Sequence, residues 1–284
     1  MKPALEGESV ECLLGKLGGM EGTLVKIRAD VVTEGALVIT CFPSVGMVSS
    51  VVGHYLIDNL DLEFVGGVVD PRLPPLTLVT DGKPMPIIRA YAGKPECSIE
   101  GCDKIILLMS ELVIPSPLVH DIVWALYDWS KGSKIRMGIL VDAFSKDGLG
   151  GNSGIEEPTV DYEDTEGTDL VGIGATDHVC EMLKDMDVPM LSSGVIRGIN
   201  GVLLSEARRR AIDVLSVMVE ADPRFPDARA AAALVKKLNA ILPTTHLDDQ
   251  PLLEEAQMLE EQLKSLLSQA APNEAPSPSS MLYG

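Results

Sequence analysis

Three short runs of the chain are apolar at almost every position, and this pattern predicts the centre of a sheet. They are Leu37–Cys41, 104–109 and 135–141. A half-exposed strand alternates polar and apolar residues, whereas a strand that is apolar throughout is covered on both faces. We therefore expect these three runs to be central, parallel strands of one sheet.

The apolar residues change from strand to helical spacing after the first run. Pro43 cannot donate a ladder hydrogen bond, and Gly46 permits a tight turn. The spacing then predicts a helix from residue 47, followed by a strand over Glu63–Val69 that completes a βαβ unit. The same criteria predict further helices over 118–129, 177–185, 202–219, 227–242 and 248–267.

Two other patterns predict the margins of the sheet. Residues 23–29 alternate in polarity, which is typical of a half-exposed edge strand. The Asp81-Gly82 step lies between two short β-like runs, which predicts a hairpin.

Composition divides the chain into segments. We expect an N-terminal arm (1–22), an α/β core domain (23–247), a C-terminal helix (248–268) and a disordered linker with a tail (269–284). The core carries a glycine-rich and then acidic excursion at 145–169. In the C-terminal helix, an apolar seam at a/d spacing predicts packing on the domain or on a second subunit. Its members are Leu252, Ala256, Leu259, Leu263 and Leu266.

Charge and cysteine usage narrow the possible partners. The net charge of −19 opposes binding to nucleic-acid phosphates and to anionic membranes. The five cysteines are scattered, which favours reduced thiols in the cytoplasm over a disulfide framework. The chain has no apolar run long enough to span a membrane and does not begin with a signal peptide.

Motifs for catalysis and cofactor binding are missing from the sequence. There is no P-loop, no Cys-x-x-Cys, no Gly-x-Ser-x-Gly and no histidine pair at metal-ligand spacing. We therefore predict no cofactor, no metal and no catalytic residue. The loop of Pro43, Ser44 and Gly46 opens a helix and is a possible ligand loop, because free N–H groups there attract anions.

An enzyme remains the alternative interpretation. Ser44, Glu111, Asp142 and Ser193 all follow predicted strand ends and would line one crevice if those ends meet. The excursion at 145–169 would then be a lid. None of the histidines is well placed in the sequence to act as a base for these residues.

Several short motifs, taken in order from about residue 37 to residue 267, resemble the archaeal branch of the proteasome assembly chaperone family. They are Phe42-Pro43-Ser44-Val45-Gly46-Met47-Val48, Tyr55-Leu56-Ile57, Asp81-Gly82, Ile199-Asn200-Gly201-Val202-Leu203-Leu204, Pro226-Asp227 with Ala231, and Leu252 with Glu255-Ala256. The resemblance implies a single α/β domain. Its central, mostly parallel sheet would be flanked by helices, similar to phosphorylase-like and hydrolase-like folds, with helical C-terminal elements.

The resemblance also gives the end of the sequence a meaning. It implies a homo-oligomer that binds the α subunits of the proteasome core particle without ATP, as an assembly chaperone or an activator. Leu282, Tyr283 and Gly284 match the hydrophobic–tyrosine–any signature of proteasome-binding proteins. We therefore expect these three residues to be the proteasome-binding element.

Overall fold

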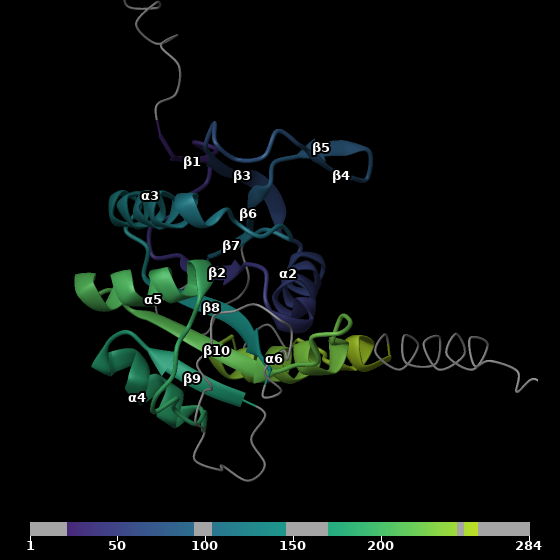
Figure 1. The fold of residues 1–284 in the computed structure, drawn as a ribbon, viewed down its shortest axis with the longest axis vertical. Coiled ribbons are helices and arrows are strands. Elements are labelled where there is room, and N and C mark those ends of the chain that lie inside the picture. The colour runs from purple at the N-terminus through teal and green to yellow at the C-terminus, as the bar shows by residue number, and fades with distance from the viewer. Residues whose placement is uncertain (1–21, 94–103, 146–169, 243–246, 255–284) are drawn as a thin grey trace, which may run out of the picture.

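The computed structural model describes residues 22–93, 104–145, 170–242 and 247–254, and these residues form one mixed sheet with helices on both faces (Figure 1). The sheet has eight strands in the order β1-β3-β6-β7-β2-β8-β10-β9. They are β1 (Leu24–Ile27), β2 (Leu37–Cys41), β3 (Glu63–Val69), β6 (Ile88–Gly93), β7 (Ile105–Met109), β8 (Met137–Phe144), β9 (Leu170–Gly174) and β10 (Val214–Glu220).

The centre of the sheet confirms the prediction from the apolar runs. Strands β7, β2, β8 and β10 are neighbours, and each adjacent pair is parallel. Every residue of β2 and of β7 is buried, because helices cover both faces there.

The outer strands make the sheet mixed. Strand β6 is antiparallel to both β3 and β7, so β3 runs in the direction of β2 without touching it. The two strands of the predicted βαβ unit are therefore separated by β6 and β7. At the two ends of the sheet, β1 and β9 pair antiparallel with β3 and β10. The predicted hairpin is present as β4 (Leu78–Thr80) and β5 (Lys83–Met85), which project beyond the sheet (Figure 1).

The helix expected over 202–219 is wrong in its second half. Helix α5 (Gly198–Arg210) ends where Ala211 adopts a left-handed conformation with φ 53°, and β10 follows. Leu215 and Met218 happen to continue the helical spacing, but Val214, Val217 and Val219 favour a strand. The segment becomes a strand because β8 and β9 lie on either side of it and hydrogen-bond to both of its edges.

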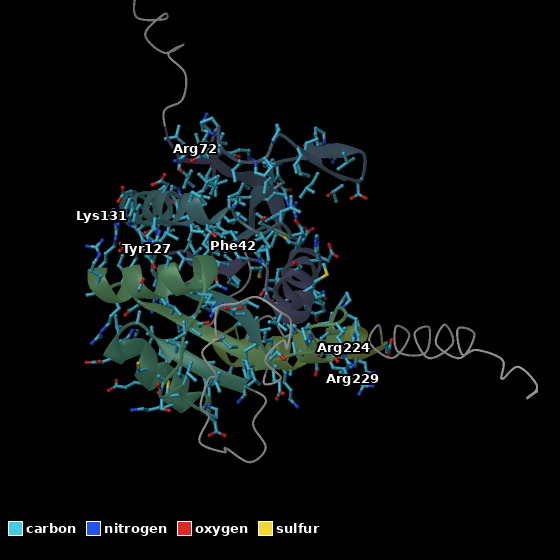
Figure 2. The ribbon with its side chains drawn as sticks, in the orientation of Figure 1. Phe42, Arg72, Tyr127, Lys131, Arg224 and Arg229 are labelled. Carbon is cyan, nitrogen blue, oxygen red and sulfur yellow. The ribbon has the colours of Figure 1, made fainter. Side chains whose placement is uncertain are left out.

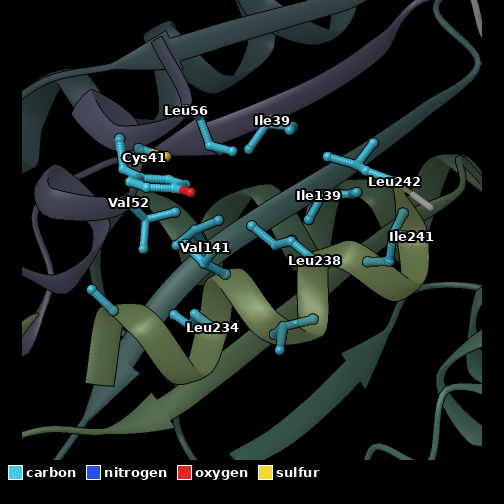
Figure 3. Packing of buried hydrophobic residues seen from close by; sticks show 14 of the residues in the cluster. Ile39, Cys41, Val52, Leu56, Ile139, Val141, Leu234, Leu238, Ile241 and Leu242 are labelled. Atoms are coloured by element: carbon cyan, nitrogen blue, oxygen red, sulfur yellow. The ribbon is translucent and has the colours of Figure 1, made fainter. Parts of the chain in front are cut away.

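The helices form two layers (Figure 1). Helices α2 (Val48–Asn59) and α6 (Ala228–Ile241) pack on one face, and α3 (Val119–Gly132) and α5 pack on the other. A short 3-10 turn precedes each of α2 and α3; these are η1 (Val45–Met47) and η2 (Ser116–Leu118). Helix α4 (Asp177–Asp185) packs beside β9. Figure 3 shows Leu56 from α2, Ile139 from β8 and Leu238 from α6 among the buried side chains of this layer. Burying each such side chain contributes roughly 1.5–3 kcal/mol.

Parts of the expected domain organisation lie outside the described residues. These are nearly all of the arm at 1–22, the excursion from residue 146 onward, and everything after residue 254. Of the C-terminal helix, residues 250–254 are described as helical, and Leu252 is buried in the core of its own domain. Within the described ranges, no helix is both long and apolar enough to cross a membrane.

Candidate functional site

The loop after β2 is held by hydroxyl groups. The Ser44 Oγ accepts a hydrogen bond from the Ser49 N–H at 3.0 Å and lies 2.8 Å from the Ser49 Oγ. The Ser49 Oγ is also 2.8 Å from the Val141 carbonyl oxygen of β8. Ser44 therefore supports the start of α2, which is the role that serines commonly have before a helix.

The same loop is closely packed against the loop that follows β10. Gly46 has φ 59°, and a Cβ atom there would lie 2.8 Å from the Asp222 carbonyl oxygen and 3.1 Å from the Asp227 Cβ. The Asp227 N–H donates to the Gly46 carbonyl oxygen at 2.8 Å. The possible ligand loop of Pro43, Ser44 and Gly46 is thus packed against the loop after β10, and Gly46 has no room there for a side chain.

Glu111 forms a charged cluster with two residues that the sequence did not connect to it. His54 Nε2 on α2 lies 2.9 Å from Glu111 Oε1, and Arg89 on β6 donates to the same oxygen. Arg89 is only 1% exposed. Burial raises the pKa of Glu111, but the hydrogen bonds from His54 and Arg89 outweigh it and bring the pKa to about 2. The cluster holds a buried arginine in place at the end of β7.

Asp142 lies in a separate, buried environment on the other face of the sheet. It is 8% exposed, accepts the Ala143 N–H at 2.8 Å, and is hydrogen-bonded by Asn200 at the start of α5. Burial raises its pKa to about 6, against the lowering effect of these two hydrogen bonds. The Oδ1 atom of Asn200 is buried and has no hydrogen-bond partner among the described residues.

The four residues of the proposed crevice therefore do not form one site in the described structure. Ser44 contacts Ser49, Glu111 contacts His54 and Arg89, and Asp142 contacts Asn200. Ser193 is exposed in the loop before α5. A nucleophile needs a base within hydrogen-bonding distance, and the one histidine in these contacts, His54, is bonded to Glu111. The described ranges also contain no group of three His, Cys, Asp or Glu residues arranged to hold a metal.

Sequence reasoning missed the pairing of His54 with Glu111. The two residues are 57 positions apart, and Arg89 joins them from a third element. The strand order that brings β6 next to β7 is not encoded in local spacing, so no motif signalled this cluster.

Apolar side chains are exposed on loops at the carboxyl ends of the parallel strands. Met47 follows β2, Val113 follows β7 and Phe225 follows β10, with exposures of 50%, 81% and 37%. Figure 2 shows Arg224, the neighbour of Phe225, on the side of α6, whereas Phe42 lies in the interior. Apolar residues that are exposed singly are normal on protein surfaces, so these three do not by themselves define a binding surface. The expected proteasome-binding residues Leu282, Tyr283 and Gly284 lie outside the described residues.

Comparison with known proteins places the chain in a family. Residues 38–267 match the PAC2 family. The crystal structure of Pyrococcus furiosus PbaA, an archaeal homolog of proteasome-assembly chaperone, has a TM-score of 0.72 and 27% sequence identity. That likeness covers 88% of this chain and 93% of PbaA.

Two further proteins are similar over most of their length. Pyrococcus furiosus PbaB, an archaeal proteasome activator, has a TM-score of 0.70 at 18% identity, covering 87% of this chain and 99% of PbaB, and so shares the fold. The uncharacterized protein MJ0106 of Methanocaldococcus jannaschii is 26% identical over 242 residues, which is 85% of this chain and 90% of that protein. The chain therefore belongs to the PAC2 family.

Proposed function

We propose that this protein binds the α subunits of the proteasome core particle through Leu282, Tyr283 and Gly284, and assists assembly or activation without ATP. The observation that carries the proposal is the hydrophobic–tyrosine–any ending behind a domain that is 27% identical to PbaA over 88% of the chain. Asp142 lies within β8 rather than after its end, and the four residues of the expected crevice have separate surroundings, so a hydrolytic enzyme is not favoured.

The physical chemistry of the tail suits weak, repeated binding. Tyr283 offers a rigid ring with a hydroxyl group, and Leu282 adds apolar area. The carboxylate of Gly284 would pair with a basic residue of the pocket. Residues 269–280 are rich in alanine, proline and serine. A flexible linker of this length has a root-mean-square reach of about 17–20 Å, so the domain remains outside the pocket.

Several tails on one oligomer would strengthen binding without any new contact. We propose that the protein is a homo-oligomer. Two arguments support this: an oligomer would present several tails at once, and the apolar seam of the expected C-terminal helix continues past Leu252.

A pull-down of core particle from cell lysate tests the proposal. The matched set is the full chain, a variant lacking Leu282–Gly284, a variant extended beyond Gly284, and Ser44→Ala as the control. Deletion and extension should each reduce the captured α subunits at least about tenfold, because the first removes the ring and the second displaces the carboxylate. Ser44→Ala should capture as much as wild type. If both tail variants capture core particle like wild type, the domain must carry the contact and the tail proposal is wrong.

A further inference from the structure

A groove lies at the edge of the sheet, away from the strand ends described above. It has a volume of about 640 Å³ and is lined by Gly22 and Thr23 before β1, Arg72 after β3, and Asp121, Trp124 and Asp128 on α3. Trp124 is 45% exposed, which is a large exposed area for an indole ring. Figure 2 shows Arg72 beside β1 at this end of the molecule.

The charged groups of the groove are already paired with one another. The Arg72 guanidinium donates to Asp70 Oδ2 at 2.7 Å and to Asp121 Oδ2 at 2.7 Å. The Asp128 carboxylate lies 3.3 Å from Arg210 Nη1. Because these pairs compensate each other, the groove has no strong demand for a charged ligand. The unsatisfied surface is the apolar face of Trp124, so the groove suits an apolar side chain.

The sequence just before the groove contains such side chains. Gly22 and Thr23 are part of its wall, so the residues before them necessarily begin there. At a maximum of about 3.6 Å per residue, Met20 lies within about 11 Å of Thr23 and Leu17 within about 22 Å. Leu13 and Leu14 precede them. We propose that Leu17 and Met20 of the N-terminal arm pack on Trp124 in this groove.

Tethering makes such a contact effective even when it is intrinsically weak. A short flexible tether holds its segment at a local concentration in the millimolar range. An arm with a Kd of about 1 mM for the groove would therefore occupy it for much of the time. A second copy of the chain lacks this advantage and would need a much larger matching surface. The proposal concerns a surface that is separate from the tail, and it stands whether or not the tail binds proteasomes.

The two tryptophans of the chain allow a direct test. In a Trp129→Phe background, Trp124 becomes the sole indole reporter. We compare the full-length protein with a variant lacking residues 2–20 and with the double variant Leu17→Ser/Met20→Ser. Both changes should shift Trp124 emission to longer wavelength and raise its acrylamide quenching constant about twofold. A synthetic peptide of residues 8–21, added at millimolar concentration to the deletion variant, should reverse the shift.

The matched control keeps Trp129 instead. In a Trp124→Phe background, the same deletion should leave emission and quenching unchanged, which shows that the effect is local to the groove. Far-UV circular dichroism melting confirms that each variant is folded. Unchanged Trp124 emission in both the deletion and the double variant would overturn the proposal. The proposal would also be overturned if Trp124 stayed protected from acrylamide in the deletion variant and this protection increased with protein concentration, because a second copy of the chain would then cover Trp124.

Discussion

Asp142 shows how much one buried side chain can alter the stability of this fold. It is a residue of β8 that is hydrogen-bonded by Asn200 in the first turn of α5, and burial raises its pKa to about 6 from the ordinary 3.8. Since the folded-state pKa is the higher one, the folded protein holds the proton more tightly than the unfolded chain. The free energy of unfolding therefore falls as the pH rises from about 4 to about 6, by roughly 3 kcal/mol at most.

Asp142→Asn should remove this pH dependence. The amide is neutral at every pH, can still accept the Ala143 N–H, and can donate to Asn200 Oδ1 once the Asn200 amide, which donates to Asp142, turns over. We expect the variant to be about 2 kcal/mol more stable than wild type at pH 7.5 and within about 1 kcal/mol of it at pH 4.5. Urea unfolding at the two pH values measures this difference. If the substitution changes the free energy of unfolding equally at both pH values, the Asp142 pKa is not raised by folding and the prediction is wrong.

At the scale of elements, the loops after β2 and β10 are fitted to each other. The Gly46 carbonyl accepts the Asp227 N–H, while the Asp227 side chain caps α6 by accepting the Ala230 N–H at 2.9 Å. The starts of α2 and α6 are thus positioned together, although their strands are separated by β8. The motif around Gly46 consequently has a structural role that its spacing did not show.

Gly46→Ala tests this fit. The new methyl group would lie 2.8 Å from a backbone oxygen at φ 59°, so the two loops must separate. We expect a loss of about 3 kcal/mol in the free energy of unfolding. Gly198→Ala is the matched control, because Gly198 has φ 67° but a methyl group there would meet no other part of the chain within 4 Å, and the strain alone costs about 1 kcal/mol. Equal losses in a urea titration would mean that the contact between the loops contributes nothing.

At the scale of the whole molecule, two features act in opposite directions on self-association. The net charge of −19 makes copies of the chain repel each other, and salt screens this repulsion. The apolar seam expected in the C-terminal segment would favour association. Leu252, at its start, is buried in its own domain, so only the later positions of the seam are left for a partner.

Sedimentation velocity should show an oligomer that strengthens between about 50 mM and about 500 mM salt, as the repulsion is screened. Leu259→Asp places a charge in the seam and should dissociate the oligomer, because burying an unpaired carboxylate costs several kcal/mol. Gln257→Asp adds the same charge outside the seam and should have little effect beyond general repulsion. A monomer for wild type at both salt concentrations would refute the oligomer, and equal effects of the two variants would refute the seam.

The sequence by itself determined the elements whose signal is local. The three apolar runs became central parallel strands because a strand with no polar face needs cover on both sides. The Asp81-Gly82 turn was also readable, because it depends on a few adjacent residues. The ordered family motifs identified the PAC2 relationship before any contact was known.

Only the tertiary structure decided what depends on distant segments. The segment after Arg210 fitted helical spacing, and the partners β8 and β9 made it a strand. His54, Arg89 and Glu111 come from three separate parts of the chain. Asp142 is separated from Ser44 because Asp142 is bonded to Asn200 of α5, whereas Ser44 is bonded to Ser49 of α2. Strand order and facing are set by the free energy of the whole core, summed over all of its contacts, and no local pattern carries that sum.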